Sequence, residues 1–458
     1  MSSITTSNVT SGFIDLATFD EIEKYLYGGH DATAYFVRET RKATWFTQVP
    51  VVLSRAAGSP AFGQEWSVAI SRAGDYMLQT WLRVTFPEVA VNTGAGGNVD
   101  YRVRWTRNLM HNLIRECCIT FNDLIAARFD NYHLDFWAAF TVPESKRVGY
   151  RNMIGQIDDL IIGKTKLSAK TLNLPLPFFY SRDSGVALPT AALPYNEMRI
   201  NFHFRDWDQL LILELPVGGG TAEMRRAIVT STDLTTGIPL LGSTQVWANY
   251  AIVSNDERKR MACAPRDILV EQVQTAPRQA YTPASNAQPS FDIRFSHAIK
   301  VLFFAVRNTT WKAEWSNYIT NSPYVSLTGT DFTPNNSADP ILQTSLIYEN
   351  TNRLGAMGSD YFSLINPWFH APTIPTETGY HMYSYSLDFM SLDPMGSTNY
   401  GKLTNVSIVP EASAAAVLAA GGSNGSGATF KQTYEFIVTA INNNIIRVSG
   451  GALGFPVL

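Results

Sequence analysis

Three short groups of residues in this chain have the types and spacing that chemistry requires. Asp130, His133 and Asp135 together could offer oxygen and nitrogen ligands to a metal ion. Asp206–Asp208 has the Asp-x-Asp spacing of a divalent-cation site, and Gly421–Gly425 has the Gly-x-Ser-x-Gly letters of a serine nucleophile. Each group would make the chain an enzyme, provided that the surrounding elements hold it in a working geometry.

The elements expected around these groups do not favour catalysis. A helix over 133–140 would place Asp130 and His133 on one face without a third ligand, which indicates a solvated helix face. Asp206–Asp208 is typical of a polar turn that closes a strand. The serine motif falls in the Ala/Gly/Ser-rich segment Glu411–Gly427, which we expect to be a flexible surface loop. We therefore predict no catalytic residue, no metal ligand and no cofactor-binding residue.

The composition indicates a packed protein that buries much of its own surface. Only 16% of the 458 residues are charged, while 12% are aromatic and 45% apolar, and the net charge is −3. Interface cores are poor in charge and rich in aromatic residues, so this balance is a sign of self-association. It supplies no overall basic field for nucleic acid. We interpret as solvated edges or subunit contacts the three basic clusters, at Arg38–Lys42, Arg102–Arg107 and Arg258–Arg260.

Cysteine usage and the first residues indicate a reducing compartment. Cys117, Cys118 and Cys263 cannot form a disulfide framework, and the Ser/Thr-rich start lacks the basic and apolar regions of a signal peptide. No apolar run approaches the ~18 residues that cross a bilayer. We attribute to chance the five Asn-x-Ser/Thr sequons, at Asn8, Asn308, Asn335, Asn405 and Asn424.

Alternation of apolar and polar residues with period two dominates the chain and predicts an all-β fold. Leu78–Phe86 and Arg199–Arg205 alternate in this way, and proline and glycine clusters separate many such short strands. Near the end, Tyr434–Ile441 and Ile445–Val448 flank three asparagines, which favours a terminal hairpin. Strands of this kind are typical of antiparallel sandwiches.

Helical signals are few. Thr18 and Glu21 form a capping box, and Phe19, Ile22 and Leu26 then fall near one helical face. We expect a short helix over these residues at the N-terminus, and other short helices in loops of a β scaffold.

A weakly patterned stretch, Glu214–Ser243, divides the chain into halves of similar length. Faint self-similarity links the halves, since the neighbourhood of His111 resembles that of His297, and Arg199-Ile200 resembles Lys402-Leu403. The offsets of these pairs differ, so a duplication is suggested but not established. We predict two related β-sandwiches in tandem.

Longer irregular strings carry a resemblance to a known family. The chain resembles the major capsid proteins of iridoviruses, and most of all those of the invertebrate iridescent viruses. The resemblance covers essentially the whole chain and rests on seven strings, at Ser11–Thr18, Pro175–Pro189, Leu193–Ile200, Arg266–Pro277, Arg294–Lys300, Gly396–Asn405 and Gly454–Leu458.

This resemblance implies a double jelly roll, which is two eight-stranded antiparallel sandwiches with short helices in loops. It implies a structural protein, not an enzyme, that forms homotrimers with a pseudo-hexagonal outline. Such trimers tile the icosahedral shell of a large double-stranded DNA virus assembled in the host cytoplasm. We divide the chain accordingly into an N-terminal arm with a base helix, a first jelly roll, a linker and a second jelly roll, over 1–30, 31–213, 214–243 and 244–458.

The resemblance also implies that the N-terminal arm faces an internal viral membrane. Phe19, Ile22 and Leu26 would then anchor the base of the trimer or contact minor capsid proteins, unless their helix only closes its own sandwich. We expect two loops rich in Trp, Tyr and Asn at subunit interfaces or tops, Trp311–Tyr318 and Asn366–Tyr380. No sequence-specific contact with nucleic acid is implied.

Two other classes of protein remain open. The main alternative is a carbohydrate-binding or hydrolytic β-sandwich, and the other is a single-stranded nucleic-acid binder. A sugar platform would use the exposed faces of aromatic residues, although core packing is the simpler explanation for the four candidates, Trp368, Phe369, Tyr380 and Tyr383.

Overall fold

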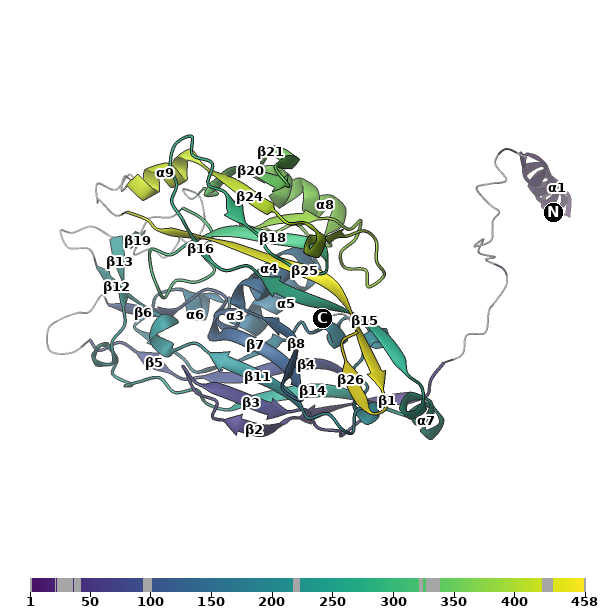
Figure 1. Ribbon diagram of the computed structural model, residues 1–458, viewed down its shortest axis with the longest axis horizontal. Coiled ribbons are helices and arrows are strands. Elements are labelled where there is room, and N and C mark those ends of the chain that lie inside the picture. The colour runs from purple at the N-terminus through teal and green to yellow at the C-terminus, as the bar shows by residue number, and fades with distance from the viewer. Residues whose placement is uncertain are drawn as a thin grey trace. The chain divides into compact units, whose positions relative to one another are not determined.

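Figure 1 shows the computed structural model, which describes residues 2–20, 22, 36, 43–93, 101–216, 223–320, 324–326, 338–421 and 431–456. The chain divides into two units, Met1–Trp45 and Phe46–Leu458. The first unit contains helix α1 (Ser2–Ala17). We predicted a helix after Thr18 instead. Phe19 is irregular, Ile22 lies in a turn and Leu26 lies outside the described residues, so the predicted helix is untested beyond Ile22.

The second unit begins with a β-sandwich made largely from the first half of the chain. One sheet has the order β1-β14-β4-β10 and the other the order β2-β3-β11-β7-β8, all antiparallel. The strands are β1 (Phe46–Val52), β2 (Ser54–Gly58), β3 (Glu65–Ala69), β4 (Tyr76–Phe86), β7 (Ile114–Phe121), β8 (Leu124–Phe129), β10 (Lys170–Pro175), β11 (Met198–Phe204) and β14 (Thr244–Val253).

A second sandwich follows from the second half. Its sheets have the orders β15-β25-β18-β22 and β17-β24-β20-β21, and short strands β16, β23 and β26 pair at the margins of the first of these. The strands are β15 (Arg266–Thr275), β16 (Gln279–Tyr281), β17 (Phe291–Asp292), β18 (Ala298–Asn308), β20 (Ile341–Tyr348), β21 (Thr351–Gly358), β22 (His381–Ser384), β23 (Thr398–Asn399), β24 (Val406–Ala412), β25 (Tyr434–Ser449) and β26 (Ala452–Gly454).

The two sandwiches repeat one connectivity. Strands β1, β14, β4 and β10 take the places of β15, β25, β18 and β22, and strands β3, β11, β7 and β8 take those of β17, β24, β20 and β21. Strands β20 and β21 each begin 227 residues after β7 and β8 (341 − 114 and 351 − 124). Both hairpins turn through two residues with positive φ, Asn122-Asp123 and Glu349-Asn350. The predicted tandem of related jelly-roll sandwiches is therefore confirmed.

Three details of the predicted repeat and its boundaries differ from the structure. His111 lies in the helix before β7 and His297 before β18, so they are not equivalent positions. Strand β14 (Thr244–Val253) was predicted to open the second sandwich, but it pairs with β4 and β1 of the first. The predicted linker 214–243 contains strand β13, which pairs with β12.

Smaller elements complete the second unit. A further sheet has the order β19-β13-β12-β6, and β5 pairs with β9. The strands are β5 (Val89–Ala90), β6 (Arg102–Trp105), β9 (Lys166–Leu167), β12 (Leu211–Pro216), β13 (Glu223–Ile228) and β19 (Tyr324–Ser326). The helices are α3 (Leu109–Leu113), α4 (Asn131–Thr141), α5 (Glu144–Ile154), α6 (Asp158–Ile161), α7 (Asn255–Cys263), the π-helical turn η6 (Tyr361–Ile365), α8 (Asn366–His370) and α9 (Ala414–Gly421). Single 3₁₀ turns are η1 (Phe179–Ser181), η2 (Ser184–Val186), η3 (Thr190–Ala192), η4 (Trp207–Gln209), η5 (Ser231–Asp233) and η7 (Tyr400–Lys402).

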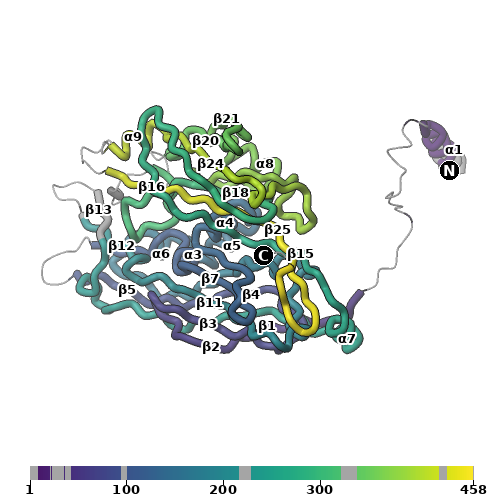
Figure 2. Tube along the Cα trace, viewed as in Figure 1, coloured from purple at the N-terminus to yellow at the C-terminus, as the bar shows by residue number. Residues whose placement is uncertain are grey.

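The end of the chain differs from the predicted hairpin. Strand β25 runs unbroken from Tyr434 to Ser449, through the three asparagines, and pairs with both β15 and β18. The hairpin lies later, at Gly450 and Gly451, both with positive φ, where β25 turns into β26. In the yellow end of Figure 2, this hairpin reaches the strands of the first half, and the amide of Tyr195 donates to the carbonyl of Gly451.

The segment predicted as a flexible loop, Glu411–Gly427, is ordered where the structure describes it. Strand β24 continues to Ala412, and α9 covers Ala414–Gly421 with Ala416 and Ala419 buried. Alanine favours a helix more strongly than any other residue, so the low complexity of this segment does not prevent regular structure.

The two largest buried apolar clusters of the second unit meet at the sheet that contains β18. Phe304 packs into the core of the second sandwich, whereas Phe303 belongs to the cluster of the first. Alternate residues of β18 point to opposite faces of the sheet. Both faces of β18 are therefore buried, and α4 lies between the two sandwiches (Figure 1).

Candidate functional site

The predicted metal-ligand group lies in the contact between the two sandwiches. We call this contact the seam, and it consists of α4, the segment Ala313–Tyr318 and the strands β18 and β25. Asp135, on α4, is 2% exposed. Its Oδ1 lies 2.8 Å from Nδ1 of His111, and its Oδ2 accepts from the hydroxyls of Ser316 at 2.7 Å and Tyr318 at 2.8 Å. One carboxylate thus joins the first sandwich to a segment of the second.

His133 and Asp130 do not converge with Asp135 on a ligand. Asp130 caps α4, where its side chain accepts from the amide of His133 at 3.0 Å. Burial and the cation of Arg182 lower the pKa of His133 to about 3, so its imidazole is neutral, and burial raises the pKa of Asp130. The helix predicted over 133–140 is confirmed within α4, but the solvated face is wrong, because the second sandwich covers it.

Two arginines enclose a tryptophan in the seam. The guanidinium carbon of Arg205 lies 3.5 Å from the ring centroid of Trp315, and that of Arg307 lies 3.8 Å from it. Arg205 follows β11 of the first sandwich, whereas Arg307 and Trp315 belong to the second. The Nε of Arg205 also donates to the carbonyl of Asn112 at 2.9 Å. Cations stacked on an aromatic face in a desolvated site contribute more than they do at the surface.

Buried ion pairs also cross the seam. Arg104 is fully buried between Glu214 of the first half and Glu314 of the second, at 2.6 and 3.5 Å. Tyr132 of α4 donates to Glu435 of β25 at 2.9 Å, and Arg307 pairs with the same carboxylate at 3.0 Å. Removal of one partner of such a pair leaves an uncompensated buried charge and is strongly destabilising, even where the intact pair adds little net stability.

Aromatic packing fills the rest of the seam. Phe303 of β18 is 0% exposed and stacks on Phe136 and Phe140 of α4, with ring centroids 5.7 and 5.4 Å apart. Tyr380 meets both α4 rings edge-on. Core packing is confirmed for Tyr380 and Tyr383 among the four platform candidates. The segment Trp311–Tyr318, expected at subunit interfaces or tops, contributes Trp315 and Tyr318 to the seam instead.

The other chemical motifs form no site in the described part of the chain. Asp206 caps the 3₁₀ turn Trp207–Gln209, so the expected polar turn is confirmed. In the serine motif, Gly421 ends α9 and the residues after it lie outside the described part of the chain. Among the residues that the structure describes, no group of three or more His, Cys, Asp or Glu side chains could hold a metal ion. No helix of the described residues is long and apolar enough to cross a membrane.

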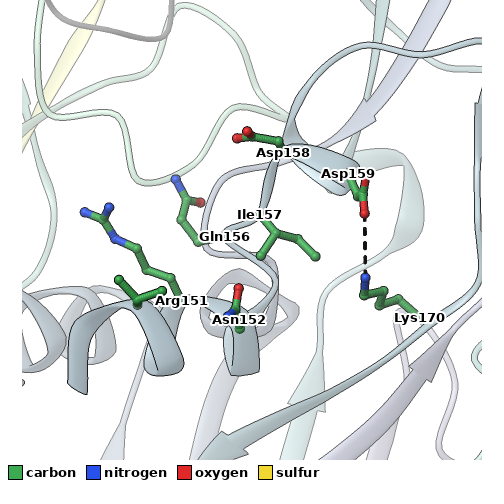
Figure 3. Close-up of a pocket in the computed structure, with 8 residues that line it drawn as sticks. Arg151, Asn152, Gln156, Ile157, Asp158, Asp159 and Lys170 are labelled. Atoms are coloured by element: carbon green, nitrogen blue, oxygen red, sulfur yellow. Dashed lines mark ion pairs between the residues drawn. The ribbon is translucent and has the colours of Figure 1, made fainter. Parts of the chain in front are cut away.

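A hollow of about 490 Å³ opens beside α5 and α6 (Figure 3). Arg151, Asp158, Asp159 and Lys170 line it, with Lys170 paired to Asp159 at 3.8 Å. Both signs of charge are present and partly neutralise each other. The hollow therefore has no charge that would select one class of small ligand.

Two exposed aromatic surfaces lie outside the seam. Trp368 and Phe369 of α8 are each 71% exposed, so the interpretation that they pack in the core is wrong. Leu364 and Ile365 of η6 and Leu387 are exposed around them, and His370 Nδ1 lies 2.9 Å from the carbonyl of Leu387. We call these five side chains the α8 patch: Leu364, Ile365, Trp368, Phe369 and Leu387.

The second surface is the outer face of the sheet β1-β14-β4-β10. Trp81 and Trp247 are paired across β4 and β14 and stack with centroids 6.2 Å and planes 7° apart. Both are partly exposed, because the core side of β4 is occupied by Leu82 and Val84. We call this surface the tryptophan face. The alternation of β4 indicated that Trp81 faces outward, but not that its ring stacks on Trp247.

The described basic clusters and sequons differ in burial: Arg258–Arg260 and Asn405 are exposed, whereas Arg104 and Asn308 are buried. Arg104 is buried, and Arg107 pairs with Glu377 at 2.7 Å. Arg258 pairs with Asp75 at 2.7 Å, whereas Arg38–Lys42 lies outside the described residues. Asn308 is 3% exposed and hydrogen-bonded to Gln432, so this sequon cannot be modified in the folded protein.

Comparison with known proteins identifies the chain's relatives. Two family models match: that of the major capsid protein N-terminus over residues 34–253, and that of the large eukaryotic DNA virus major capsid protein over residues 257–454. The two matches meet between β14 and β15.

Curated relatives cover the whole chain. The chain is 68% identical to the major capsid protein of Costelytra zealandica iridescent virus, over 100% of both chains, and 64% identical to that of Invertebrate iridescent virus 6, again over 100% of both. It is 46% identical to that of Rana tigrina ranavirus over 100% of both chains. These relatives are structural proteins and not enzymes.

Solved structures agree with the fold. The chain matches the PBCV-1 virus capsid with a TM-score of 0.72 and 19% identity, over 93% of this chain and 100% of that one. It matches the Faustovirus major capsid protein with a TM-score of 0.68 and 10% identity, over 94% and 95%. Their fold is the double jelly roll that the repeated sheet order describes. The chain therefore belongs to the family of iridescent virus major capsid proteins, which form the capsid of a large DNA virus.

Proposed function

We propose that three copies of this chain close into a homotrimer, and that these trimers are the pseudo-hexagonal capsomers of an icosahedral shell. The observation that carries this proposal is the repetition of one sheet connectivity within the chain. A ring of three chains then presents six lobes of similar shape. Such a ring can pack in a hexagonal array through repeated contacts, although its true symmetry is only threefold.

The surface supports self-association. The chain has 16% charged residues, and it exposes the large apolar side chains of the α8 patch. Exposed apolar surface of this kind marks interaction sites in soluble proteins. We propose that the boundary between the two jelly rolls follows Val253, because β14 completes the first sandwich.

We further propose that the unit Met1–Trp45 is the base of the capsomer and contacts minor capsid proteins or the internal membrane. Phe19 and Ile22 are exposed, as such contacts require. A matched test compares the full chain with a variant that lacks residues 2–22. Trimers should persist in this variant, whereas incorporation into virus particles should fall. Normal incorporation would contradict a role for this segment.

The mass of the purified protein tests the trimer. Light scattering should give about 152 kDa, three times the 50.8 kDa of one chain, and electron microscopy should show particles with a hexagonal outline. A stable monomer would overturn the proposal. A clear hit in a glycan-binding screen, lost in Trp368→Ala, would instead favour a carbohydrate-binding β-sandwich.

A further inference from the structure

The arrangement of the seam within one chain indicates how two copies of the chain could contact each other. Within one chain, α4 of the first sandwich packs against the outer face of the sheet β15-β25-β18-β22 of the second. At its centre, Phe303 stacks on Phe136 and Phe140. Helix α4, which follows the β7–β8 hairpin of the first sandwich, is thus covered by the outer face of a sheet of the second sandwich.

The second sandwich has its own counterpart of this helix. In the first sandwich, α4 starts two residues after β8 ends; in the second, η6 starts three residues after β21 ends and continues into α8. The counterpart is uncovered, since Trp368 and Phe369 are each 71% exposed whereas Phe136 and Phe140 are fully buried. By chain order, the α8 patch is therefore the counterpart of the α4 side chains that the seam covers in the first sandwich.

The first sandwich has the matching free sheet face. Strands β4 and β18 are equivalent and each has eleven residues; Trp81 is the sixth residue of β4, as Phe303 is of β18. Trp81 stacks on Trp247, and Val52 lies opposite Trp247 on β1 with its side chain exposed. The tryptophan face is thus the counterpart of the sheet face that covers α4.

We infer that the α8 patch of one copy docks on the tryptophan face of a second copy of this chain. This inference rests on the proposed trimer and names the surfaces that close it. The two faces differ, so the contact is head-to-tail, and three such contacts alternate with three seams around a ring of six sandwiches. Aromatic and aliphatic side chains meet aromatic rings at this contact, as in the seam.

Two single substitutions test the contact. Phe369→Glu places a charge in the α8 patch, and Trp247→Glu places one in the tryptophan face. Each should lower the mass from about 152 kDa to 50.8 kDa. Leu124→Glu is the matched control, since Leu124 is an exposed apolar residue on the other sheet of the same sandwich, and it should remain trimeric.

A mixture of the two variants gives a sharper result. The Trp247→Glu chain keeps its α8 patch and the Phe369→Glu chain keeps its tryptophan face, so one contact can form between them. The mixture should therefore contain a dimer of about 102 kDa that cannot close into a ring. A contact between two identical patches would give no such complementation. Circular dichroism checks folding, and Val52→Glu replaces Trp247→Glu if that variant does not fold.

An intermolecular disulfide locates the contact directly. In a Cys263→Ser background, which removes the exposed cysteine, Trp247→Cys with Phe369→Cys should form covalent trimers on oxidation, and Leu124→Cys with Phe369→Cys should not. If the wild type is a trimer, both glutamate variants are also trimers and the cysteine pair forms no cross-link, this inference is overturned. The proposed trimer is then left intact. In that case another partner covers the α8 patch. A monomeric wild type would overturn the proposed function itself.

Discussion

Trp81 and Phe303 occupy the same position in the two jelly rolls, yet Phe303 is fully buried and Trp81 is partly exposed. The sheet order makes the two strands equivalent, so the difference arises from what lies against them. Helix α4 packs on Phe303 because the second sandwich follows the first in the same chain. Among the described residues, no helix packs on Trp81 in this way, and we infer that another copy supplies it.

Removal of the ring between Arg205 and Arg307 should destabilise the protein. Trp315→Ala leaves a cavity and two buried cations without the ring that separates them. Loss of a buried tryptophan costs about 3–5 kcal/mol, and we expect the free energy of unfolding to fall by that amount in denaturant titrations. Trp45→Ala removes an exposed tryptophan and should have little effect. If the free energy of unfolding falls by the same amount in both variants, Trp315 has no special role in the seam.

Asp135 should hold the two sandwiches in register. Asp135→Ala leaves His111, Ser316 and Tyr318 without their shared acceptor. Buried polar groups that lose a partner each cost about 1–3 kcal/mol, so we expect a loss of several kcal/mol. Asp135→Asn keeps one acceptor oxygen and should lose less. The exposed Asp393→Ala is the control, and urea titration followed by tryptophan fluorescence is the measurement.

The neutral His133 should make the protein less stable in acid. Its pKa is about 3 in the folded protein and 6.5 in the unfolded chain. Between these values the unfolded chain binds a proton that the folded protein does not, so stability falls as the pH falls from 6.5 towards 3. The slope from one such group is at most about 1.4 kcal/mol per pH unit. Asp130 acts in the opposite direction, because its pKa is raised on folding.

His133→Phe tests this effect, since it keeps a ring beside Phe129 and Trp137 but removes the titration. The free energy of unfolding should depend less on pH in this variant than in the wild type when measured at pH 7 and pH 5. The matched variant Phe140→Leu changes a buried ring of the same helix that carries no titratable group, and it should keep the wild-type slope. An unchanged slope in His133→Phe would contradict the prediction.

The local sequence pattern was sufficient to predict the strands, but it could not predict the contacts in the seam. Alternation correctly predicted β4 and β11, because one face of each strand packs into its own sandwich. The same reasoning failed for α4, whose polar residues Asp135 and His133 were expected to be solvated. The hydroxyl partners of Asp135 come from a segment about 180 residues later, and no local pattern reports such a contact.

The asparagines of β25 show a second limit of local reasoning. Asn442–Asn444 has the composition of a turn, yet β25 continues through it, because β15 and β18 supply ladder partners on both sides. Asn444 also donates to Gln272 of β15 at 3.0 Å. Tertiary pairing therefore overrides the local preference. The α8 patch was missed for a related reason, since aromatic residues of a β protein are usually buried.

Substitution by alanine should change the stability of the protein in opposite directions at two glycines, Gly379 and Gly149. Gly379 has a φ of +104°, and a Cβ there would lie 2.3 Å from the carbonyl oxygen of Tyr318. Gly379→Ala should therefore shift Tyr318 and the adjacent Tyr380, both of which pack on Phe136, and lower the melting temperature. Gly149 lies inside α5, where an added Cβ would meet no atom within 4 Å, so Gly149→Ala should raise stability by about 0.5–1 kcal/mol. Thermal unfolding of both variants measures the difference, and a Gly379→Ala protein as stable as the wild type would show that the loop yields without disturbing the seam.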